Sequence, residues 1–390
     1  MTDLYRRDSF TWLAFLMMAL YAYFLNMFGP IAPFLKDELK LSYTVSSLHF
    51  SAFAVGILVI GLAGDRLIKQ LGRRLSLWIG ALGFSGGAVA LLLGRNPILT
   101  IGAAFLMGLI GSLILSIVPS ALADRHGENR AIALSEANVI GSLAGAAGPL
   151  LVGWFALTRL GWRAALAIGA CAPILMAVGF IKVKTPPSAI QNVGGGKQVL
   201  PARYWIFWLA ILLAVAIEFC MVSWSADYLA TGLNMPKVAA AQSVSLFLAA
   251  MIIGRLAGSR LVQRFSPRVL VSGSLSIALT GFSIYYLAAS ALMGAVGLFI
   301  TGLGVASLYP LILSMAIESA GELTIQASSR ATLASGLAIL SLPLTLGRLA
   351  DAEGIRLAYG VVFLLIVGTF VVFQLAVGVR DQASWIRKNL

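Results

Sequence analysis

Residues 64–74 read Gly64-Asp65-Arg66-Leu67-Ile68-Lys69-Gln70-Leu71-Gly72-Arg73-Arg74. Residues 258–268 read Gly258-Ser259-Arg260-Leu261-Val262-Gln263-Arg264-Phe265-Ser266-Pro267-Arg268. An offset of 194 positions (258 minus 64) lays the second segment on the first without a gap. The chain therefore carries an internal repeat.

The same offset aligns further pairs along both halves. They are Ser51 with Ser245, Phe53 with Phe247, Ser120 with Ser314, Asp124 with Glu318, Gly127 with Gly321, Glu128 with Glu322, Pro149 with Pro343 and Gly153 with Gly347. One offset that matches glycines, prolines and charges in several segments predicts two equivalent halves. In a strongly apolar chain, this pattern is typical of two membrane bundles with a passage between them.

The composition places the chain in a membrane. Hydrophobic residues make up 59%, charged residues only 11%, and the mean hydropathy is +0.93. Apolar stretches long enough to cross ~30 Å of hydrocarbon lie near 10–35, 44–68, 75–94, 97–122, 131–156, 163–181, 204–229, 238–261, 269–289, 292–317, 330–349 and 356–378. We therefore predict an all-α membrane protein with twelve transmembrane helices in two pseudo-symmetric six-helix bundles.

The long polar interruption predicts the domain boundaries: a bundle over 1–181, a cytoplasmic linker over 182–203 and a second bundle over 204–390. Within the linker, Gly194-Gly195-Gly196-Lys197 resembles part of a phosphate-binding loop. It lacks the first glycine of that motif, and Gln198 stands where a Ser or Thr is required. The segment therefore indicates a flexible connection rather than a nucleotide site.

The net charge is +13, and the distribution of the basic residues indicates how the chain is oriented in the membrane. With both termini in the cytoplasm, most of the 28 basic residues, Arg255 among them, fall at the cytoplasmic face. The basic residues left outside are Lys36, Lys40, Arg95, Arg159, Arg163, Lys237, Arg348 and Arg356. This asymmetry follows the positive-inside rule. It predicts a multi-pass protein of the plasma (inner) membrane and no nucleic-acid partner.

The connection between the second and third spans carries the clearest motif. It reads Gly61-Leu62-Ala63-Gly64-Asp65-Arg66, followed by Gly72-Arg73-Arg74. This resembles the cytoplasmic loop signature of the major facilitator superfamily, and the spans, the linker and the weaker copy at Gly258 extend the resemblance over the whole chain. The five residues Leu67–Leu71 depart from the family pattern, and the extra length adds about one helical turn, which can alter the contacts of the two arginines.

The resemblance implies a secondary active transporter that works by alternating access. It also implies a cytoplasmic latch, in which Asp65 meets the positive N-terminus of the eleventh span at Ala327-Ser328-Ser329-Arg330. Glu136 could extend this network by pairing with Arg66, Arg73, Arg125 or Arg130, or could itself carry a proton. The alternative is a solvated loop that fixes the topology of the chain and has no role in gating.

The fifth span contains the glycine run Gly141, Gly145, Gly148 and Pro149. It resembles the family's antiporter signature, with Ala144 and Val152 in place of two expected glycines. Small residues in a row also form helix-packing faces. We expect export by antiport and keep proton-coupled import of a sugar, organic acid or similar metabolite as the alternative.

Glu218 is the acid nearest the middle of a span, about fifteen residues after Arg203 and ~20 Å along the helix. Desolvation there favours the neutral acid, so Glu218 could exchange a proton or bind a cationic group. A neutral carboxylic acid that only bonds a neighbouring helix is the structural alternative. The offset of 194 places Phe24 at the equivalent position, so the acid breaks the repeat.

Around Glu218 we predict a pocket for a small molecule, because aromatic rings with a few amides and hydroxyls are typical of such sites. The candidates are Tyr21, Tyr23, Asn26, Trp224, Ser225 and Gln242, with Asn138 and Tyr285 as weaker members. We expect His49 to be a hydrogen-bonded structural residue and Asp227 to mark the outer rim.

Other classes of protein fit less well. Only His49 and His126 could serve as histidine bases or ligands, and no metalloprotease or nucleophile motif occurs, so an enzyme is not expected. A channel or a receptor on the same scaffold stays open. We predict no cofactor and no metal, a proton gradient as the energy source, a small-molecule substrate, the lipid bilayer as surroundings and a monomeric state.

Overall fold

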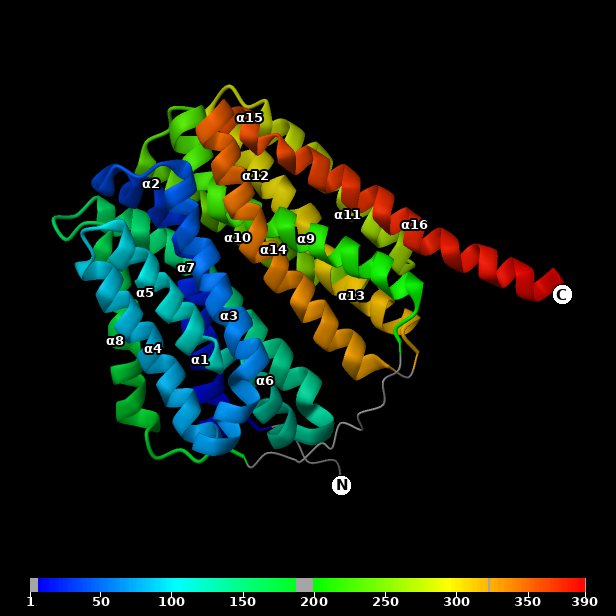
Figure 1. Cartoon of the computed structure of the whole chain (residues 1–390), viewed down its shortest axis with the longest axis horizontal. Helices are drawn as coiled ribbons and strands as arrows, with labels where there is room; N and C mark the ends of the chain where they lie inside the picture. Colours follow the sequence, from blue (N-terminus) through cyan, green and yellow to red (C-terminus); the bar gives the residue numbers. More distant parts are fainter. Residues whose placement is uncertain (1–5, 187–198, 322, 390) are drawn as a thin grey trace. The chain divides into compact units, whose positions relative to one another are not determined.

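The computed structural model describes residues 6–186, 199–321 and 323–389, and within them the side chains of 65, 131, 324–326, 328, 329 and 379–389 are not described. The described residues form helices joined by short connections (Figure 1). The first half comprises α1 Ser9–Leu25, α2 Phe28–Leu39, α3 Tyr43–Leu71, α4 Arg73–Leu93, α5 Pro97–Gly111, α6 Leu113–His126, a 3₁₀ turn Gly127–Asn129, α7 Arg130–Ala156 and α8 Arg163–Phe180.

The second half repeats this order. It comprises α9 Ala202–Asp227, a π-helical turn Tyr228–Gly232, α10 Lys237–Leu261, α11 Pro267–Tyr286, α12 Ala291–Val305, α13 Leu308–Ser319, α14 Thr324–Glu353, α15 Ile355–Tyr359 and α16 Val361–Asn389. In the described part, eleven helical segments are long and apolar enough to span a membrane. A twelfth arises if α1 and α2, which meet at a 41° bend, form one span. The predicted all-α membrane architecture is confirmed.

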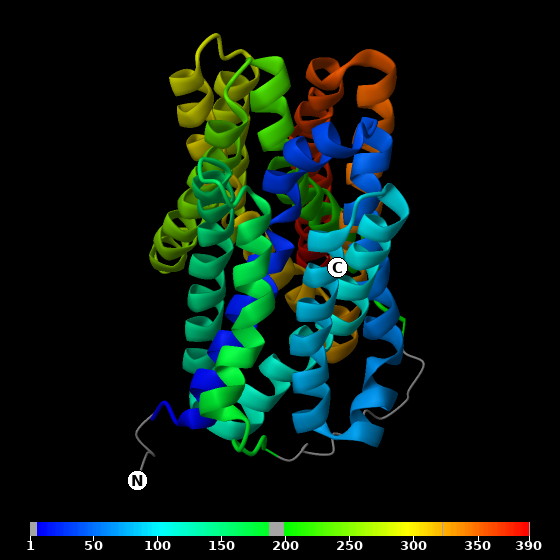
Figure 2. The ribbon, with the colours of Figure 1, turned by 90° about the vertical axis from the view of Figure 1, so that its left-hand side faces the viewer.

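The contacts divide the chain into two compact units. Unit 1 comprises Met1–Val193 and Lys237–Ser245, and unit 2 comprises Gly194–Pro236 and Leu246–Leu390. The helices of unit 1 run side by side over most of their length (Figures 1 and 2). The domain boundaries drawn from the sequence at 181 and 204 stay a prediction.

The internal repeat is visible in the backbone of each unit. Asn96 (φ −141°, ψ 156°) and Ser290 (φ −140°, ψ 156°) are N-caps in equivalent places, and each side chain accepts a hydrogen bond from the backbone N–H three residues later. Gly127 and Gly321, also 194 positions apart, both take positive φ, at +51° and +60°. Equivalent helices therefore begin and end by the same local chemistry in both halves.

Helix α1 lies at the centre of unit 1, where it packs against α4, α6, α7 and α8. Its buried Phe24 stacks on Phe84 of α4, with ring centroids 5.1 Å apart and planes at 8°. Tyr21 meets the same Phe84 ring edge-on. A hydrophobic helix that is apolar on nearly all sides is what a buried central position requires.

Helix α9 has the equivalent central place in unit 2 and packs against α13, α14 and α16. Its end is followed by the π-helical turn, where Tyr228 stacks on Tyr359 with ring centroids 4.8 Å apart. Tyr285 of α11 joins them at 5.1 Å from Tyr228. These three rings are fully buried within the unit.

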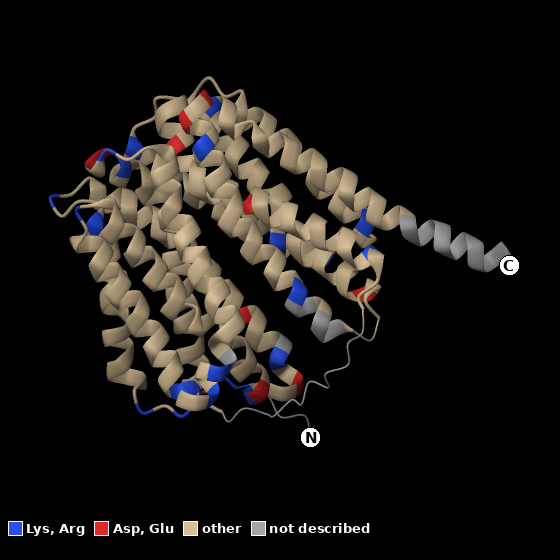
Figure 3. Cartoon of the chain, in the orientation of Figure 1, with Lys and Arg blue, Asp and Glu red and all other residues tan. Residues whose placement is uncertain are grey.

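Charged residues gather near the ends of the helices, and few lie at mid-length (Figure 3). This distribution is expected where the middle of each helix lies in hydrocarbon or protein, because a charge there is costly without a partner. The exceptions at mid-length are therefore the first places to look for a functional site.

Candidate functional site

Glu218 has a charged partner within its own unit. Its Oε1 lies 3.4 Å from a terminal guanidinium nitrogen of Arg255, which comes from α10. The Glu218 side chain is 22% exposed and the Arg255 side chain 43%. The arginine also directs its Nε at the carbonyl oxygen of Ala306, at 3.4 Å. An acid inside a membrane helix is thus paired with a base from the neighbouring span.

Three hydrogen bonds fix the first half of α9, and hence the register of Glu218. The Tyr204 hydroxyl donates to the carbonyl of Ala327 at 2.6 Å, and the Trp208 indole N–H donates to the carbonyl of Arg330 at 2.7 Å. Arg203 donates to a carbonyl on α16 at 2.9 Å. Because these donors bind the backbone of α14 and α16, α9 is anchored independently of Glu218.

Two further polar side chains complete what we call the Glu218 cluster: Glu218, Arg255, Tyr309 and Ser335. Tyr309 of α13 interacts electrostatically with Glu218, and its hydroxyl is hydrogen-bonded to the side chain of Ser335 on α14. Four helices of unit 2 therefore each contribute one polar group. Such a convergence can hold a proton and orient a small polar ligand.

Sequence reasoning named Glu218 as a candidate but did not place Arg255, Tyr309 or Ser335 beside it. The offset of 194 was the available signal, because Arg255 stands where the first half has Gly61, Tyr309 where it has Leu115, and Ser335 where it has Gly141. With Glu218 in place of Phe24, every member of the cluster breaks the repeat. The cluster is therefore not a requirement of the shared scaffold.

The candidates in unit 1 make contacts within their own unit. Tyr23 donates its hydroxyl to the carbonyl of Ala165 at 2.7 Å, and Asn26 donates its amide to the carbonyl of Ala22 at 2.8 Å. Tyr21 is buried in the aromatic core, whereas Asn138 on α7 is exposed. The structure does not bring these four together as one lining, so their role in binding stays a prediction.

Two candidates in unit 2 do meet. The backbone carbonyl of Ser225 accepts a hydrogen bond from the Tyr285 hydroxyl at 3.3 Å, and the Ser225 hydroxyl lies 3.0 Å from that of Tyr359. Trp224 is buried beside them in the chain, at 1% exposure. Gln242 belongs to the part of α10 that groups with unit 1.

The loop motif is mostly helical. Helix α3 continues through Asp65 and Arg66 to Leu71, and Gly72 (φ +79°) makes the turn into α4. Only glycine adopts this conformation readily, so Gly72 sets the sharp connection. Gly61 is an exposed position on the same helix, and the side chain of Asp65 lies outside the described residues. The predicted latch, and with it Ser328 and Ser329, therefore stays a prediction.

The arginines and acids at this end of unit 1 form ion pairs. Arg73 bonds Asp124 at 2.6 Å. Arg74 donates to the carbonyl of Ile181. Glu136 pairs with Arg7, at 2.5 and 2.9 Å, a partner that the sequence did not indicate. These contacts tie α1, α4, α6, α7 and the end of α8 together within the unit.

The glycine run of the fifth span is a packing face on α1. A Cβ added at Gly141 would meet Met18 and Ala22, one at Gly145 would meet Asn26, and one at Gly148 would meet Met27. Pro149 continues inside α7 without ending the helix. The run therefore serves the close approach of two helices, which glycine permits.

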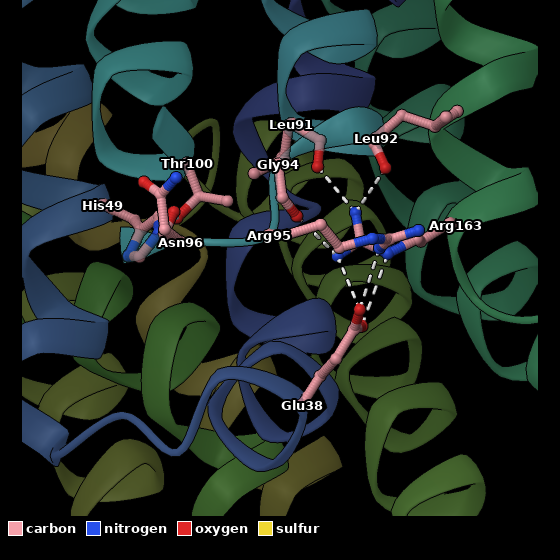
Figure 4. Close-up of polar contacts among 9 residues, drawn as sticks. All are labelled: Glu38, His49, Leu91, Leu92, Gly94, Arg95, Asn96, Thr100 and Arg163. Atoms are coloured by element: carbon pink, nitrogen blue, oxygen red, sulfur yellow. Dashed lines mark hydrogen bonds and ion pairs between the residues drawn. The ribbon is translucent and has the colours of Figure 1, made fainter. Parts of the chain in front are cut away.

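A second ion cluster lies at the C-terminal end of α4, whose first residues are Arg73 and Arg74. Figure 4 shows its side chains. Glu38 accepts from Arg95 at 2.9 Å and from Arg163 at 3.1 Å. Arg163 also donates to three carbonyls at the end of α4. Beside them, His49 lies 2.9 Å from the Thr100 hydroxyl and 3.0 Å from the Ser46 carbonyl. These are structural contacts, as expected for His49.

No group of three His, Cys, Asp or Glu side chains that could hold a metal occurs among the described residues. The Glu218 cluster itself presents a carboxylate, a guanidinium and two hydroxyl groups, which can bind a proton and form ion pairs.

Comparison with known proteins now gives the family. The model of the Major Facilitator Superfamily matches residues 14–340. The chain belongs to the major facilitator superfamily. A Yersinia pestis protein described as an uncharacterized MFS-type transporter is 24% identical over 348 residues, covering 87% of this chain and 88% of that protein. The hexuronate transporter of Bacillus subtilis is 26% identical over 222 residues, covering 51% and 50%.

Solved structures share the fold. A bacterial homolog of the human lysosomal transporter Spinster, in an inward-facing and occupied conformation, superposes with a TM-score of 0.81 at 16% identity, over 96% of this chain and 97% of that one. A D-xylose-proton symporter superposes with a TM-score of 0.72 at 15% identity, over 93% and 96%. The protein is thus a multi-pass membrane transporter of the major facilitator superfamily fold, with secondary transport as its activity.

Proposed function

We propose that this protein moves a small organic solute across the inner membrane by rocker-switch alternating access, with the proton gradient as its energy source. In this proposal Glu218 carries the coupled proton. The observation that supports it is an acid within a membrane span, paired at 3.4 Å with a single arginine from the next span. Acids at such depth are costly, so their presence marks proton or substrate pathways.

Two directions of coupling remain candidates. The Gly141–Pro149 run resembles an antiporter signature, but its glycines pack on α1, and this packing does not distinguish antiport from symport. Proton-coupled import has a specific observation in its favour, because Arg255 beside Glu218 opposes the binding of a cation that would exchange with the proton. Relatives include a hexuronate transporter, and the shared fold includes a D-xylose-proton symporter. We therefore favour symport.

The test starts from a ligand-stabilisation screen on detergent-purified protein, followed by uptake of the hits into proteoliposomes with an imposed pH gradient. Wild-type protein is expected to accumulate the solute saturably and only while the gradient persists. Glu218→Gln should lose gradient-driven accumulation by about tenfold or more and retain exchange of internal for external solute. An unchanged response to the gradient in this variant would remove Glu218 from the mechanism.

The same uptake assay distinguishes a transporter from a channel or a receptor. A channel would give flux that does not saturate, and a receptor would give binding without flux. Each variant should elute and unfold like the wild type, so that a loss of transport reports coupling rather than folding.

A further inference from the structure

We propose that Arg255 binds the carboxylate of an organic-anion substrate, and that a proton on Glu218 makes Arg255 available for it. This inference rests on the proposed function and names its substrate class. It predicts symport of one proton with one negative charge.

The geometry of the Arg255–Glu218 pair leaves N–H donors of Arg255 available for a ligand. A guanidinium carries five N–H donors in a planar fork that matches two carboxylate oxygens. The two contacts of Arg255, to Glu218 and to the carbonyl of Ala306, are both 3.4 Å long and neither is bidentate. Arg255 is also the more exposed partner, at 43% against 22% for Glu218. A substrate carboxylate could therefore form the fork-to-fork contact that Glu218 does not make.

The charges of the cluster select the ligand. With Glu218 ionised, Arg255 has its counter-ion and the pair has no net charge. When Glu218 takes up a proton, Arg255 is left with one uncompensated positive charge, and a bound carboxylate restores neutrality. A cation would meet Arg255 unfavourably in the protonated state, and a neutral solute would leave it uncompensated. Charge inside a membrane protein is costly unless paired, so the proton and the anion should bind together.

The polar neighbours fit the same role. Tyr309 interacts electrostatically with Glu218 and is hydrogen-bonded to Ser335, so one hydroxyl group lies within electrostatic range of the acid and a second supports it. A protonated acid needs an acceptor, and a bound organic acid with hydroxyl groups needs further donors. All four positions differ from their repeat equivalents. The shared scaffold does not require them, which leaves binding as the reason for the cluster.

The first experiment measures thermal stabilisation of the purified protein by matched pairs of probes. The pairs are D-glucuronate with D-glucose, benzoate with benzamide, and succinate with succinamide. We expect stabilisation by carboxylates and not by their neutral counterparts. Over the pH range in which Glu218 is ionised in the free protein and the probe is a carboxylate, the apparent affinity should rise by about tenfold for each unit that the pH falls, because one proton is then taken up with each anion.

Two variants and one control locate the effect. Arg255→Gln should lose carboxylate binding by about tenfold or more. Glu218→Gln mimics the protonated acid, so it should bind the carboxylate with an affinity that no longer depends on pH. Arg264→Gln removes an exposed arginine just after the same helix and should bind like the wild type.

The inference is overturned if no carboxylate stabilises the protein, if neutral counterparts stabilise it equally, or if Arg255→Gln binds carboxylates within about twofold of the wild type. Its failure differs from that of the proposed function. Gradient-driven transport of a neutral or cationic solute would contradict the inference that the substrate is an organic anion, but it would agree with proton coupling. Carboxylate transport that ignores the pH gradient would refute proton coupling itself.

Discussion

Asp8 lies immediately before α1 and joins that helix to the end of α6. Its Oδ1 accepts hydrogen bonds from the backbone N–H and the hydroxyl of Thr11, at 2.9 and 2.7 Å. Its Oδ2 accepts from the Nε of Arg125 at 2.7 Å. Partial burial is the largest influence and opposes ionisation, but the bonds from Thr11 and Arg125 together outweigh it and hold the pKa of Asp8 below its usual value.

Because the folded protein lowers the pKa of Asp8, the charged carboxylate stabilises the fold at neutral pH. That contribution is lost as the pH falls below about 4 through the folded pKa. Asp8→Asn keeps a good N-cap but removes the charge, so its unfolding midpoint should fall less steeply with acid. Asp8→Ala also loses the cap and should cost about 1 kcal/mol at neutral pH. Thermal unfolding in detergent across the acid range checks both, and equal acid slopes for the Asp8→Asn variant and the wild-type protein would contradict the assignment.

The side chain of Arg163 contacts two other helices, the end of α4 and Glu38 on α2. It is 13% exposed, donates to the carbonyls of Leu91 and Leu92 at 2.7 Å each, and pairs with Glu38. These carbonyls end α4, where a cation is favoured. Arg163→Gln should lower the free energy of unfolding by about 2 kcal/mol, measured by thermal or denaturant unfolding. Arg159→Gln, at an exposed position nearby, should change it by less than about 0.5 kcal/mol. Equal effects would show that the cap is unimportant.

Between elements, glycines decide how closely helices pack. A Cβ added at Gly108 of α5 would collide with the carbonyl oxygen of Phe53 on α3, and one at Gly302 of α12 would collide in the same way with Phe247 on α10. Both glycines and both phenylalanines are 194 positions apart. The repeat thus preserves a helix crossing, not only a sequence pattern.

Gly108→Ala should therefore destabilise the protein by about 1–3 kcal/mol, because the backbone of α3 must move. Gly102→Ala is the matched control on the same helix, since a Cβ there meets nothing within 4 Å. It should be neutral or slightly stabilising, because alanine favours a helix over glycine. Unfolding midpoints of the two variants, compared in one detergent, give the answer. Similar losses in both would mean that helix propensity, not the crossing, governs α5.

The elements also show what the sequence could predict and what it could not. Long apolar stretches specify membrane helices directly, so the spans and the repeat were predictable. Local breaks were not, because the bend after α1 depends on how Asn26 caps the helix. The extra helical turn expected from Leu67–Leu71 is present as the end of α3, but the second span was predicted to end at residue 68, because the glycines and charges of the motif resemble a loop. The sequence named Glu218 as a candidate from its place within a span, and it placed Arg255 at the cytoplasmic face. The pairing could not be predicted, since only the three-dimensional structure shows that the two side chains approach to 3.4 Å.

At the scale of the whole molecule, the two halves share a scaffold and differ in their charges. The shared features are caps, turns and helix crossings, such as Asn96 with Ser290 and Gly108 with Gly302. The differences collect at the Glu218 cluster. The proposed alternating access would use both features: similar halves that rock against each other, and an asymmetric site that recognises the solute.

The latch predicted at Asp65 would affect the whole molecule, because it would set the balance between the states open to the cytoplasm and to the outside. Asp65→Asn removes the charge that the N-terminus of the eleventh span would attract, so the state open to the cytoplasm should gain population. For the test, a reporter cysteine is placed at Asn138, a predicted pocket residue, in a background with Cys171 and Cys220 replaced by serine. An impermeant thiol reagent is then applied from each side of the membrane in turn. We expect Asp65→Asn to raise labelling from the cytoplasmic side and lower it from the outside.

Arg66→Lys keeps the local charge and serves as control. Equal labelling of the Asp65→Asn variant and the wild-type protein from both sides would mean that Asp65 only fixes topology.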